Sequence, residues 1–530
     1  MAALLVGCGG GGGGGDSGGP APSPPPPPPP SSNSAPTLTV EDQATAEEGQ
    51  TSAVLSIEAA DPDGEPLMFS LSGPDADAFS LGSETVENAD GDGTFSNEIL
   101  AAGLDFETPT DADGDGIYRV TISVSDGTES ANQDVDITIT DQRFGDGFSF
   151  ETAATGFLRP IQTVRVPDTG DIFLIEQAGR ILFSEGALPS GGGNDPVALD
   201  LRGQVSGGNE QGLLGLALSP NFANDRTLYV NLTNIAGDTE IRQYRLFSNR
   251  NDLIDPSTEQ LILRIPQPFS NHNAGWIGFD GAGNLLIPTG DGGGANDPAG
   301  NGQDRFSLLG KVLRINPAGD DFPVDGDRNY AIPSDNPFAD GQDAAPEIFA
   351  LGLRNPYRAD YDPVSNTLYI AEVGQGAREE VNALPIGTGG GTNFGWPLFE
   401  GRLPLLGNDD TGLTPPLAEY AHGEGEGRGR SISGGFVTRL AFDGRSPDEA
   451  FFVFGDFITG NLWVLDLGKV PAGGSIDAAT FEALDPAGPI RRIGGLDQVT
   501  NVSAGAPGEV LFSSLDGQVV VGAREADSGG

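Results

Sequence analysis

Apolar and polar residues alternate with a period of two along much of this chain, and clusters of Gly, Asp, Asn and Pro interrupt the alternation. Successive side chains of a β-strand point to opposite faces, so this period indicates strands with one buried face. Gly- and Asp-rich clusters between such runs are typical of tight turns. The pattern therefore predicts an all-β protein with many short strands.

Residues 37–141 contain short alternating runs such as SAVLSIEAAD and YRVTISVSDG, which predict a β-sandwich of about 100 residues. This segment resembles a bacterial cadherin-like repeat, and the resemblance implies calcium bound by acidic residues at the strand ends. Those residues are Glu48, Asp61, Asp63, Asp105, Glu107, Asp126 and Asp141. Solvated turn acids are the alternative interpretation. The run DADGDG (residues 111–116) is interpreted as a turn, because Ile122 stands where an EF-type loop needs its closing glutamate.

Residues 142–530 repeat one unit six times: an apolar strand, a Gly/Asp turn and a second apolar strand. The six apolar strands begin at Asp171, Thr227, Asn284, Thr367, Ala450 and Glu509. β units that recur at such spacings indicate propeller blades, with the longer gaps as loop insertions. We therefore expect a six-bladed β-propeller, whose functional site lies at the mouth of the central channel.

Residues 1–36 combine a possible lipid anchor with a spacer. The sequence LLVGC ends at Cys8, the only cysteine, and matches a bacterial lipobox. Seven residues precede it, fewer than a signal peptide needs, so we expect the translation start to lie upstream. The Gly- and Pro-rich stretch that follows is typical of an extended linker. These features predict an extracytoplasmic bacterial lipoprotein that Cys8 tethers to a membrane.

Charge excludes one class of partner. Asp and Glu number 77 against 27 Lys and Arg, which gives a formal net charge of −50. Such a surface repels phosphate backbones, so we expect no nucleic-acid partner.

Four motifs identify a family. They are GGNEQGLLGLALSPNF (207–222), NHNAGWIGF (271–279), EIFALGLRNPYR (347–358) and VGQGAREEVN (373–382), the last followed by TNFGWP. Together with GDGGGANDPAGNGQDRFSLLGKVLRINP (290–317), they resemble the glucose/sorbosone dehydrogenase family over roughly residues 150–525. The family consists of six-bladed propellers and includes soluble quinoprotein aldose dehydrogenases.

The resemblance implies a dehydrogenase site that uses pyrroloquinoline quinone (PQQ). His272 corresponds to the general base, and its residue type can take a proton near neutral pH. Arg354 corresponds to the arginine that polarises the quinone, and Asn355 to a residue that orients cofactor or sugar oxygens. Glu210 stands beside the base, where quinoproteins have a glutamine. A structural role in pinning the blade turn is the alternative for Arg354 and Asn355.

Two further cofactor sites follow from the resemblance. The carbonyls that hold the quinone's calcium fall on Gly374 and Gln375, and Glu379 and Glu380 match positions that hold a further calcium. A lysine and two arginines that grip the cofactor's carboxylates in catalytic members fall near Ile458, Gln498 and Thr500 and are therefore missing. Arg428, Arg430 and Arg439 are conceivable substitutes.

These observations leave three functions open. The first is a calcium-dependent quinoprotein that oxidises an aldose at the anomeric carbon and passes electrons to an acceptor. The second is a non-catalytic cell-surface module that binds a protein or polysaccharide, as expected if the missing anchors mean that PQQ is not bound. A calcium-dependent lactonase on the same scaffold ranks last, because the motifs match the dehydrogenase family.

Overall fold

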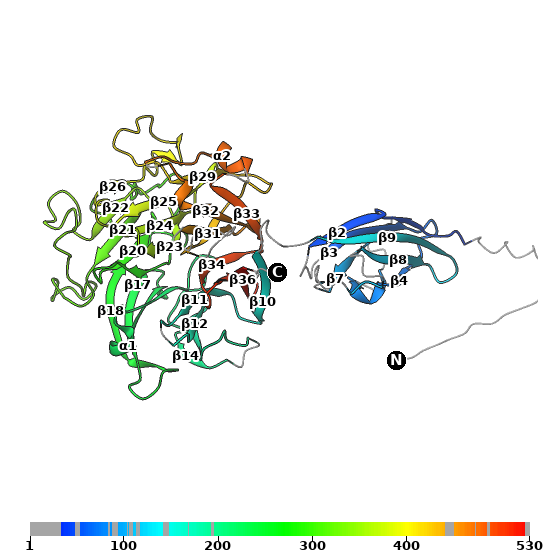
Figure 1. Cartoon of the computed structure of the whole chain (residues 1–530), viewed down its shortest axis with the longest axis horizontal. Helices are drawn as coiled ribbons and strands as arrows, with labels where there is room; N and C mark the ends of the chain where they lie inside the picture. Colours follow the sequence, from blue (N-terminus) through cyan, green and yellow to red (C-terminus); the bar gives the residue numbers. More distant parts are fainter. Residues whose placement is uncertain are drawn as a thin grey trace, which may run out of the picture. The chain divides into compact units, whose positions relative to one another are not determined.

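The computed structural model describes residues 33–47, 53–82, 85–86, 94–102, 104, 110–112, 117–140, 148–167, 169–191, 195–439, 450–471, 473–484 and 488–524. The chain divides into two compact units, residues 1–141 and 142–530 (Figure 1). Cys8, Glu48, Asp105, Glu107 and Asp141 lie outside the described residues. No helix in the described ranges is long and apolar enough to cross a membrane.

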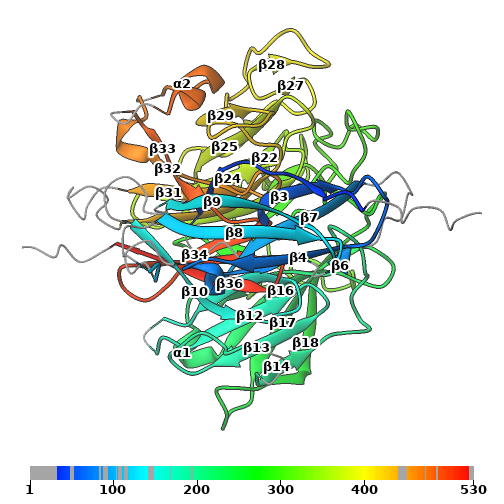
Figure 2. The same cartoon turned by 90° about the vertical axis from the view of Figure 1, so that its right-hand side faces the viewer.

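The first unit is a sandwich of two sheets. One sheet has the strand order β1 (Thr37–Thr39), β3 (Ala53–Ala60), β7 (Thr94–Ala101), β5 (Phe79–Leu81). The other has the order β2 (Gln43–Glu47), β9 (Ser130–Thr140), β8 (Ile117–Ser125), β4 (Leu67–Ser72), β6 (Thr85–Val86), and Figure 2 shows β9, β8 and β4 side by side. A short 3-10 helix, η1 (Ala76–Ala78), precedes β5.

Period-two alternation produces the core of the sandwich. In β8, the side chains of Tyr118, Val120, Ile122 and Val124 are buried while those between them are partly exposed. They pack against Ile57, Ile99 and other apolar residues of the facing sheet. The predicted β-sandwich is thus observed, whereas its relation to cadherin-like repeats stays a prediction.

The described residues of the second unit form six sheets of four or five strands, which we call blades 1 to 6 in chain order, and one two-stranded sheet. Blade 1 contains β11 (Pro160–Arg165), β12 (Ile172–Glu176), β13 (Arg180–Ser184) and β14 (Val197–Asp200). Blade 2 contains β15 (Leu213–Leu218), β16 (Thr227–Thr233), β17 (Thr239–Leu246) and β18 (Ile254–Ile265). Blade 3 contains β19 (Gly278–Phe279), β20 (Leu285–Thr289), β21 (Lys311–Ile315), β22 (Ile348–Leu351) and β26 (Thr392–Asn393).

Blade 4 contains β23 (Pro356–Asp362), β24 (Thr367–Glu372), β25 (Arg378–Pro385) and β29 (Ala418–Ala421). Blade 5 contains β30 (Ile432–Thr438), β31 (Phe451–Asp456), β32 (Asn461–Asp466) and β33 (Ile490–Gly495). Blade 6 contains β34 (Val499–Ala504), β35 (Glu509–Ser514), β36 (Gln518–Arg524) and β10 (Phe148–Thr155). A hairpin of β27 (Phe399–Glu400) and β28 (Leu403–Pro404), the helices α1 (Phe222–Asp225) and α2 (Ala478–Ala483), and η3 (Leu467–Lys469) complete the unit.

The blades form a closed ring. The first strands contact one another in the order β11, β15, β19, β23, β30, β34, and β34 contacts β11 again. β10, from the start of the unit, pairs with β36 at its end and completes blade 6. Ring closure of this kind leaves only short edges, and it joins the two ends of the unit by hydrogen bonds. The all-β, six-bladed propeller is therefore confirmed.

The six predicted apolar strands are the second strands of the blades: β12, β16, β20, β24, β31 and β35. Each of them is almost wholly buried, because neighbouring blades cover both of its faces. This explains why they appear in the sequence as continuous apolar runs. The first strands, which face the channel, are more mixed in composition and were harder to recognise.

Candidate active site

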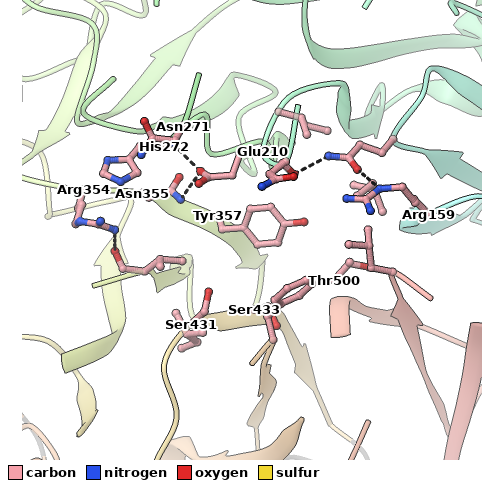
Figure 3. A pocket seen from close by; sticks show the side chains of 18 of the residues that line it. Arg159, Glu210, Asn271, His272, Arg354, Asn355, Tyr357, Ser431, Ser433 and Thr500 are labelled. Atoms are coloured by element: carbon pink, nitrogen blue, oxygen red, sulfur yellow. Dashed lines mark hydrogen bonds between the residues drawn. The ribbon is translucent and has the colours of Figure 1, made fainter. Parts of the chain in front are cut away.

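A cavity of about 570 Å³ opens at the centre of the ring. Every blade contributes to its lining, through Ile161, Leu214, His272, Tyr357, Ile432 and Thr500 in blade order. Most of these residues lie on the first strand of a blade or just before it, and Figure 3 shows several of them converging on the same space. The predicted candidates His272, Arg354, Asn355, Glu210 and Gly374 all line this cavity.

His272 is held in one orientation by a buried carboxylate. Its side chain is nearly inaccessible, and its backbone has a left-handed conformation with φ of 57°. Its Nδ1 lies 2.7 Å from Oδ1 of Asp291, whose exposed fraction is 0%. A hydrogen on Nδ1 donates to this carboxylate, which leaves Nε2 as the free acceptor. The loop is tightly fitted, because a Cβ at Gly290 would collide with the carbonyl oxygen of His272.

Asp291 is a site residue that the sequence analysis missed. Its Oδ1 also accepts a bond from the Gly293 amide at 2.8 Å, and its Oδ2 accepts one from Nε1 of Trp396 at 2.8 Å. These donors fix the position of the carboxylate beside the imidazole. An aspartate in the run TGDGGG, directly after the buried strand β20, was the available signal.

Glu210 and Asn355 support the loop backbone around His272. Oε2 of Glu210 accepts the His272 amide hydrogen at 2.7 Å and a hydrogen from Nδ2 of Asn355 at 3.3 Å. Oδ1 of Asn355 accepts the Ala274 amide hydrogen at 3.0 Å. Both polar ends of the Asn355 side chain are therefore bonded to protein. This supports the alternative interpretation of Asn355, in which it pins the turn.

Arg354 contributes a cation close to His272 (Figure 3). Its Nη1 donates to the carbonyl of Val373 at 3.0 Å, and its guanidinium lies 5.5 Å from the centre of the Trp396 ring. Its Nε is buried and has no partner. Oε1 of Glu372 accepts the Arg354 and Asn355 amide hydrogens at 2.6 and 2.8 Å. Burial raises the pKa of Glu372 well above its usual range, with the charge of Glu380 as a further cause.

Arg159, a second cation at the cavity, was also missed. Figure 3 shows it on the opposite side from Arg354. The three arginines suggested as substitutes for the missing anchors were the wrong choice. Arg428 pairs with Glu482, Arg430 with Glu424 and Arg439 with Asp362, and none of the three lines the cavity. Because the ring closes between blades 6 and 1, Arg159 at the start of blade 1 reaches the cavity, whereas arginines nearer in sequence to the last blades do not.

Thr500, one position of the expected anchors, and the two lysines of the chain are all bonded to backbone carbonyls. Thr500 lines the cavity, but its hydroxyl donates to the carbonyls of Pro160 and Ser513. Neither lysine takes part: Nζ of Lys311 donates to the carbonyls of Asn301 and Leu309, and Nζ of Lys469 to that of Gly488.

The predicted calcium turn is organised around Glu400, another residue that the sequence analysis missed. Oε1 of Glu400 accepts hydrogens from the amides of Gln375, Gly376, Ala377 and Arg378. Burial opposes ionisation, but these four bonds outweigh it, so the pKa of Glu400 is lowered. The turn is therefore fixed by a carboxylate from β27, and Gly374 lines the cavity while Gln375 does not.

Glu379 and Glu380 do not form one ion site in this structure. As neighbours in β25 they point to opposite faces. Glu379 is bonded to the Ile432 amide and to Nε2 of His422, at 2.9 and 2.6 Å, and Glu380 to Nδ2 of Asn382 at 3.1 Å. No group of three or more His, Cys, Asp or Glu side chains able to hold a metal occurs in the described part of the chain.

Of the acidic residues predicted to bind calcium in the sandwich, Asp61, Asp63 and Asp126 are among the described residues, and Asp61 and Asp126 form hydrogen bonds within their own turns. Oδ1 of Asp61 accepts the amide hydrogens of Asp63 and Glu65, and Oδ1 of Asp126 accepts those of Thr128 and Glu129. Asp63 accepts the Ser34 amide hydrogen at 2.7 Å. Calcium at Asp61, Asp63 and Asp126 stays a prediction.

Comparisons with known proteins support the family that the motifs indicated. Residues 157–413 match the family model described as glucose/sorbosone dehydrogenase. The chain is 34% identical to the HIPL1 protein of Arabidopsis thaliana, over 39% of this chain and 32% of that protein. It is 32% identical to an aldose sugar dehydrogenase of Escherichia coli, over 35% of this chain and 46% of that protein. The chain thus spans less than half the length of either relative.

A solved structure shows the same fold. The PQQ-bound form of an aldose sugar dehydrogenase from Streptomyces coelicolor superimposes with a TM-score of 0.54 and 22% identity, over 72% of this chain and all of that one. The matched region contains His272, Asp291 and Arg354 together with the motifs that surround them. The similarity to the glucose/sorbosone dehydrogenase family therefore covers residues 157–413, and the fold of the six-bladed unit is that of an aldose sugar dehydrogenase structure.

Proposed function

We propose that the cavity oxidises a sugar, an aldose at its anomeric carbon, with PQQ as cofactor. The carrying observation is the His272–Asp291 pair, which lies in the cavity next to Arg354. When bound, PQQ supplies the acceptor for the hydride that leaves the anomeric carbon. The chain has to supply a base for the hydroxyl proton and positive charge for the ligand.

The residues present fit such a ligand. The charged side chains of the lining are two arginines, Arg159 and Arg354, and one carboxylate, Glu210, together with His272. In the described residues, Nη1 of Arg354 donates to the carbonyl of Val373 and Nε of Arg159 donates to Oε1 of Gln177, so these bonds go to uncharged oxygens. Nε of Arg354 is a buried donor without a partner. Guanidinium groups that keep donors available beside these bonds suit a ligand that carries carboxylates and a polarised carbonyl.

His272 accepts the proton at Nε2. The sugar hydroxyl donates to Nε2, and the proton moves there as the C–H bond breaks. Asp291 stabilises the resulting imidazolium, because its carboxylate already accepts the hydrogen on Nδ1. Glu210 holds the backbone of His272 and Asn355 holds that of Ala274, so both act by positioning the base.

Turnover with PQQ, aldoses and a dye acceptor tests this role. Asp291→Asn is expected to lower kcat about 10²- to 10⁴-fold, because an amide favours the wrong imidazole tautomer. His272→Ala should abolish turnover while the protein still folds cooperatively, although loss of the partner of the buried Asp291 lowers its melting temperature. Asp304→Asn, an exposed acid in the same insertion, serves as the matched control. Wild-type kcat in His272→Ala would refute the proposed base.

We further propose that calcium bound through the carbonyls of Gly374 and Gln375 supports the cofactor. Calcium prefers oxygen ligands, and Gly374 already lines the cavity. An ion that binds only the folded state raises the melting temperature, so a chelator should lower it. An unchanged melting curve in chelator would contradict this part of the proposal.

A non-catalytic binding module is the second candidate. It is supported by the absence of cationic side chains at Ile458, Gln498 and Thr500 and by similarity to the hedgehog-interacting protein of Mus musculus, 29% identical over 39% of this chain and 31% of that protein. Failure of the wild-type protein to bind PQQ would favour it, with a cell-surface protein or polysaccharide as partner. In either case we propose that Cys8 carries the lipid that tethers the chain outside the cytoplasm.

A further inference from the structure

The residues that line the cavity have a different balance of charge from the rest of this strongly acidic chain. The whole sequence carries 77 acidic and 27 basic residues, yet the cavity lining has two arginines and one glutamate. That glutamate, Glu210, already accepts two hydrogen bonds from the protein. Arg358 is buried, and its guanidinium donates to the carbonyls of three lining residues, Thr500, Leu214 and Ile161, rather than to a carboxylate. Such a site favours an anionic occupant.

Arg159 is built to present its guanidinium to a ligand. It precedes β11 with a left-handed backbone, φ of 55°, and its Nε donates to Oε1 of Gln177 at 2.7 Å. Gln177 is itself immobilised, because its Nε2 donates to the carbonyls of Asn209 and Gln211 at 2.9 and 3.0 Å. This fixes Arg159 through one nitrogen and leaves both terminal nitrogens for another acceptor. A carboxylate can bind these two nitrogens in a bidentate manner.

The position of Arg159 relates it to the anchors that are missing. The hydroxyl of Thr500, one position where the resemblance expects an arginine, donates to the carbonyl of Pro160, the residue next to Arg159. Blades 6 and 1 are neighbours in the ring, since β34 contacts β11. Arg159 therefore places a cation at the edge of blade 1 that adjoins Thr500.

From this geometry we infer that Arg159 is the carboxylate anchor for the cofactor, at the end remote from Arg354. The two arginines lie on opposite sides of the cavity (Figure 3), so together they grip an elongated anion lying across the channel mouth. The inference rests on the proposed function, because it assigns a residue to the cofactor proposed there. It explains how a chain without the family's lysine and arginines at the last two blades binds a tricarboxylate.

Calorimetric titration of the full-length protein with PQQ tests the inference. Arg159→Gln should raise Kd about 10- to 100-fold, as expected for the loss of one charge-assisted pair. Arg159→Lys should recover part of the affinity, because it keeps the charge and loses the bidentate geometry. The matched control is Arg165→Gln, at the far end of the same strand and outside the cavity lining. Melting curves of all variants establish that they fold.

The trimethyl ester of PQQ separates carboxylate recognition from a general effect on the cavity. Its affinity should be the same for the wild type and Arg159→Gln, since the ester carries no carboxylate. Equal PQQ affinity of the wild type and Arg159→Gln would overturn the role of Arg159 and leave the proposed function standing. An equal loss of affinity for the ester would also overturn it, by showing a structural effect. No PQQ binding by the wild type would instead refute the proposed function.

Discussion

Arg358 offers a test of how the ring of blades is held together at its centre. Its side chain is 1% exposed, and its guanidinium donates to carbonyls of three other blades. Nη2 bonds to Ile161 at 3.0 Å, Nη1 to Leu214 at 3.1 Å and Nε to Thr500 at 3.1 Å. One side chain of blade 4 therefore links blades 1, 2 and 6. We predict that Arg358→Met destabilises the propeller substantially.

The magnitude follows from two opposing effects. Methionine leaves three buried carbonyls without their donor, and each unsatisfied group costs about 1–3 kcal/mol. Against this, the folded protein no longer has to desolvate a buried cation, which recovers part of the loss. Removing one partner from a buried charged cluster typically costs about 3–5 kcal/mol in total. For a unit of about 390 residues, an unfolding entropy of roughly 0.8 kcal/mol/K converts this to a fall of about 4–6 °C in Tm.

Differential scanning calorimetry of the wild type and variants measures this change. Arg358→Lys keeps the charge but cannot bond to three strands at once, so its Tm should lie between those of the wild type and Arg358→Met. Arg245→Met, an exposed arginine of β17, is the control and should shift Tm by less than about 1 °C. If Arg358→Met also melts within about 1 °C of the wild type, the cross-blade bonds do not stabilise the ring and the reasoning fails.

The half-buried Asp360 and the buried Glu400 predict opposite dependences on pH. Burial raises the pKa of Asp360 to about 7; the unfolded chain therefore ionises first, and the wild type loses stability as pH rises from about 4 to 7. The free energy of unfolding of Asp360→Asn, measured by denaturant titration, should rise by about 2–3 kcal/mol relative to that of the wild type as pH rises from about 5 to 8. If the two free energies change with pH in parallel, the prediction is wrong. Glu400, whose pKa is lowered by its four amide donors, stabilises the fold above the unfolded pKa. Glu400→Gln should lower the free energy of unfolding by about 1–3 kcal/mol at pH 7. The difference from the wild type should shrink as pH falls below about 4, because the carboxyl of Glu400 is then protonated. A difference that does not change with pH would show that the charge of Glu400 does not stabilise the fold.

The fold was predictable because its signal is local. A strand buried on both faces is apolar whatever lies beyond it, so runs such as TLYVNLT and TLYIAEVG mark the second strands of their blades directly. Six such runs sufficed to count the blades. The pairing of β10 with β36 has no such signal, because it joins residues from the two ends of the unit.

The candidate site was predictable only in part. His272 and Arg354 were recognised from their motifs, and the fold does bring both to one cavity. The adjacent acids Glu379 and Glu380 suggested a shared ion site, but alternation along β25 directs them to opposite faces. Arg159 stands in a short segment, LRPIQ, that has no unusual composition.

The sequence by itself determined the all-β class, the number of blades and the base and cation that define the candidate chemistry, since these depend on residue type and on neighbours two positions apart. The tertiary structure decided which other residues hold the base and the cation in position. Glu210 reaches the backbone of His272 across 62 residues, and Trp396 reaches Asp291 across 105. Such partners become neighbours only when the ring closes, because closure brings the first strands of all six blades to one axis and places Arg159 opposite Arg354.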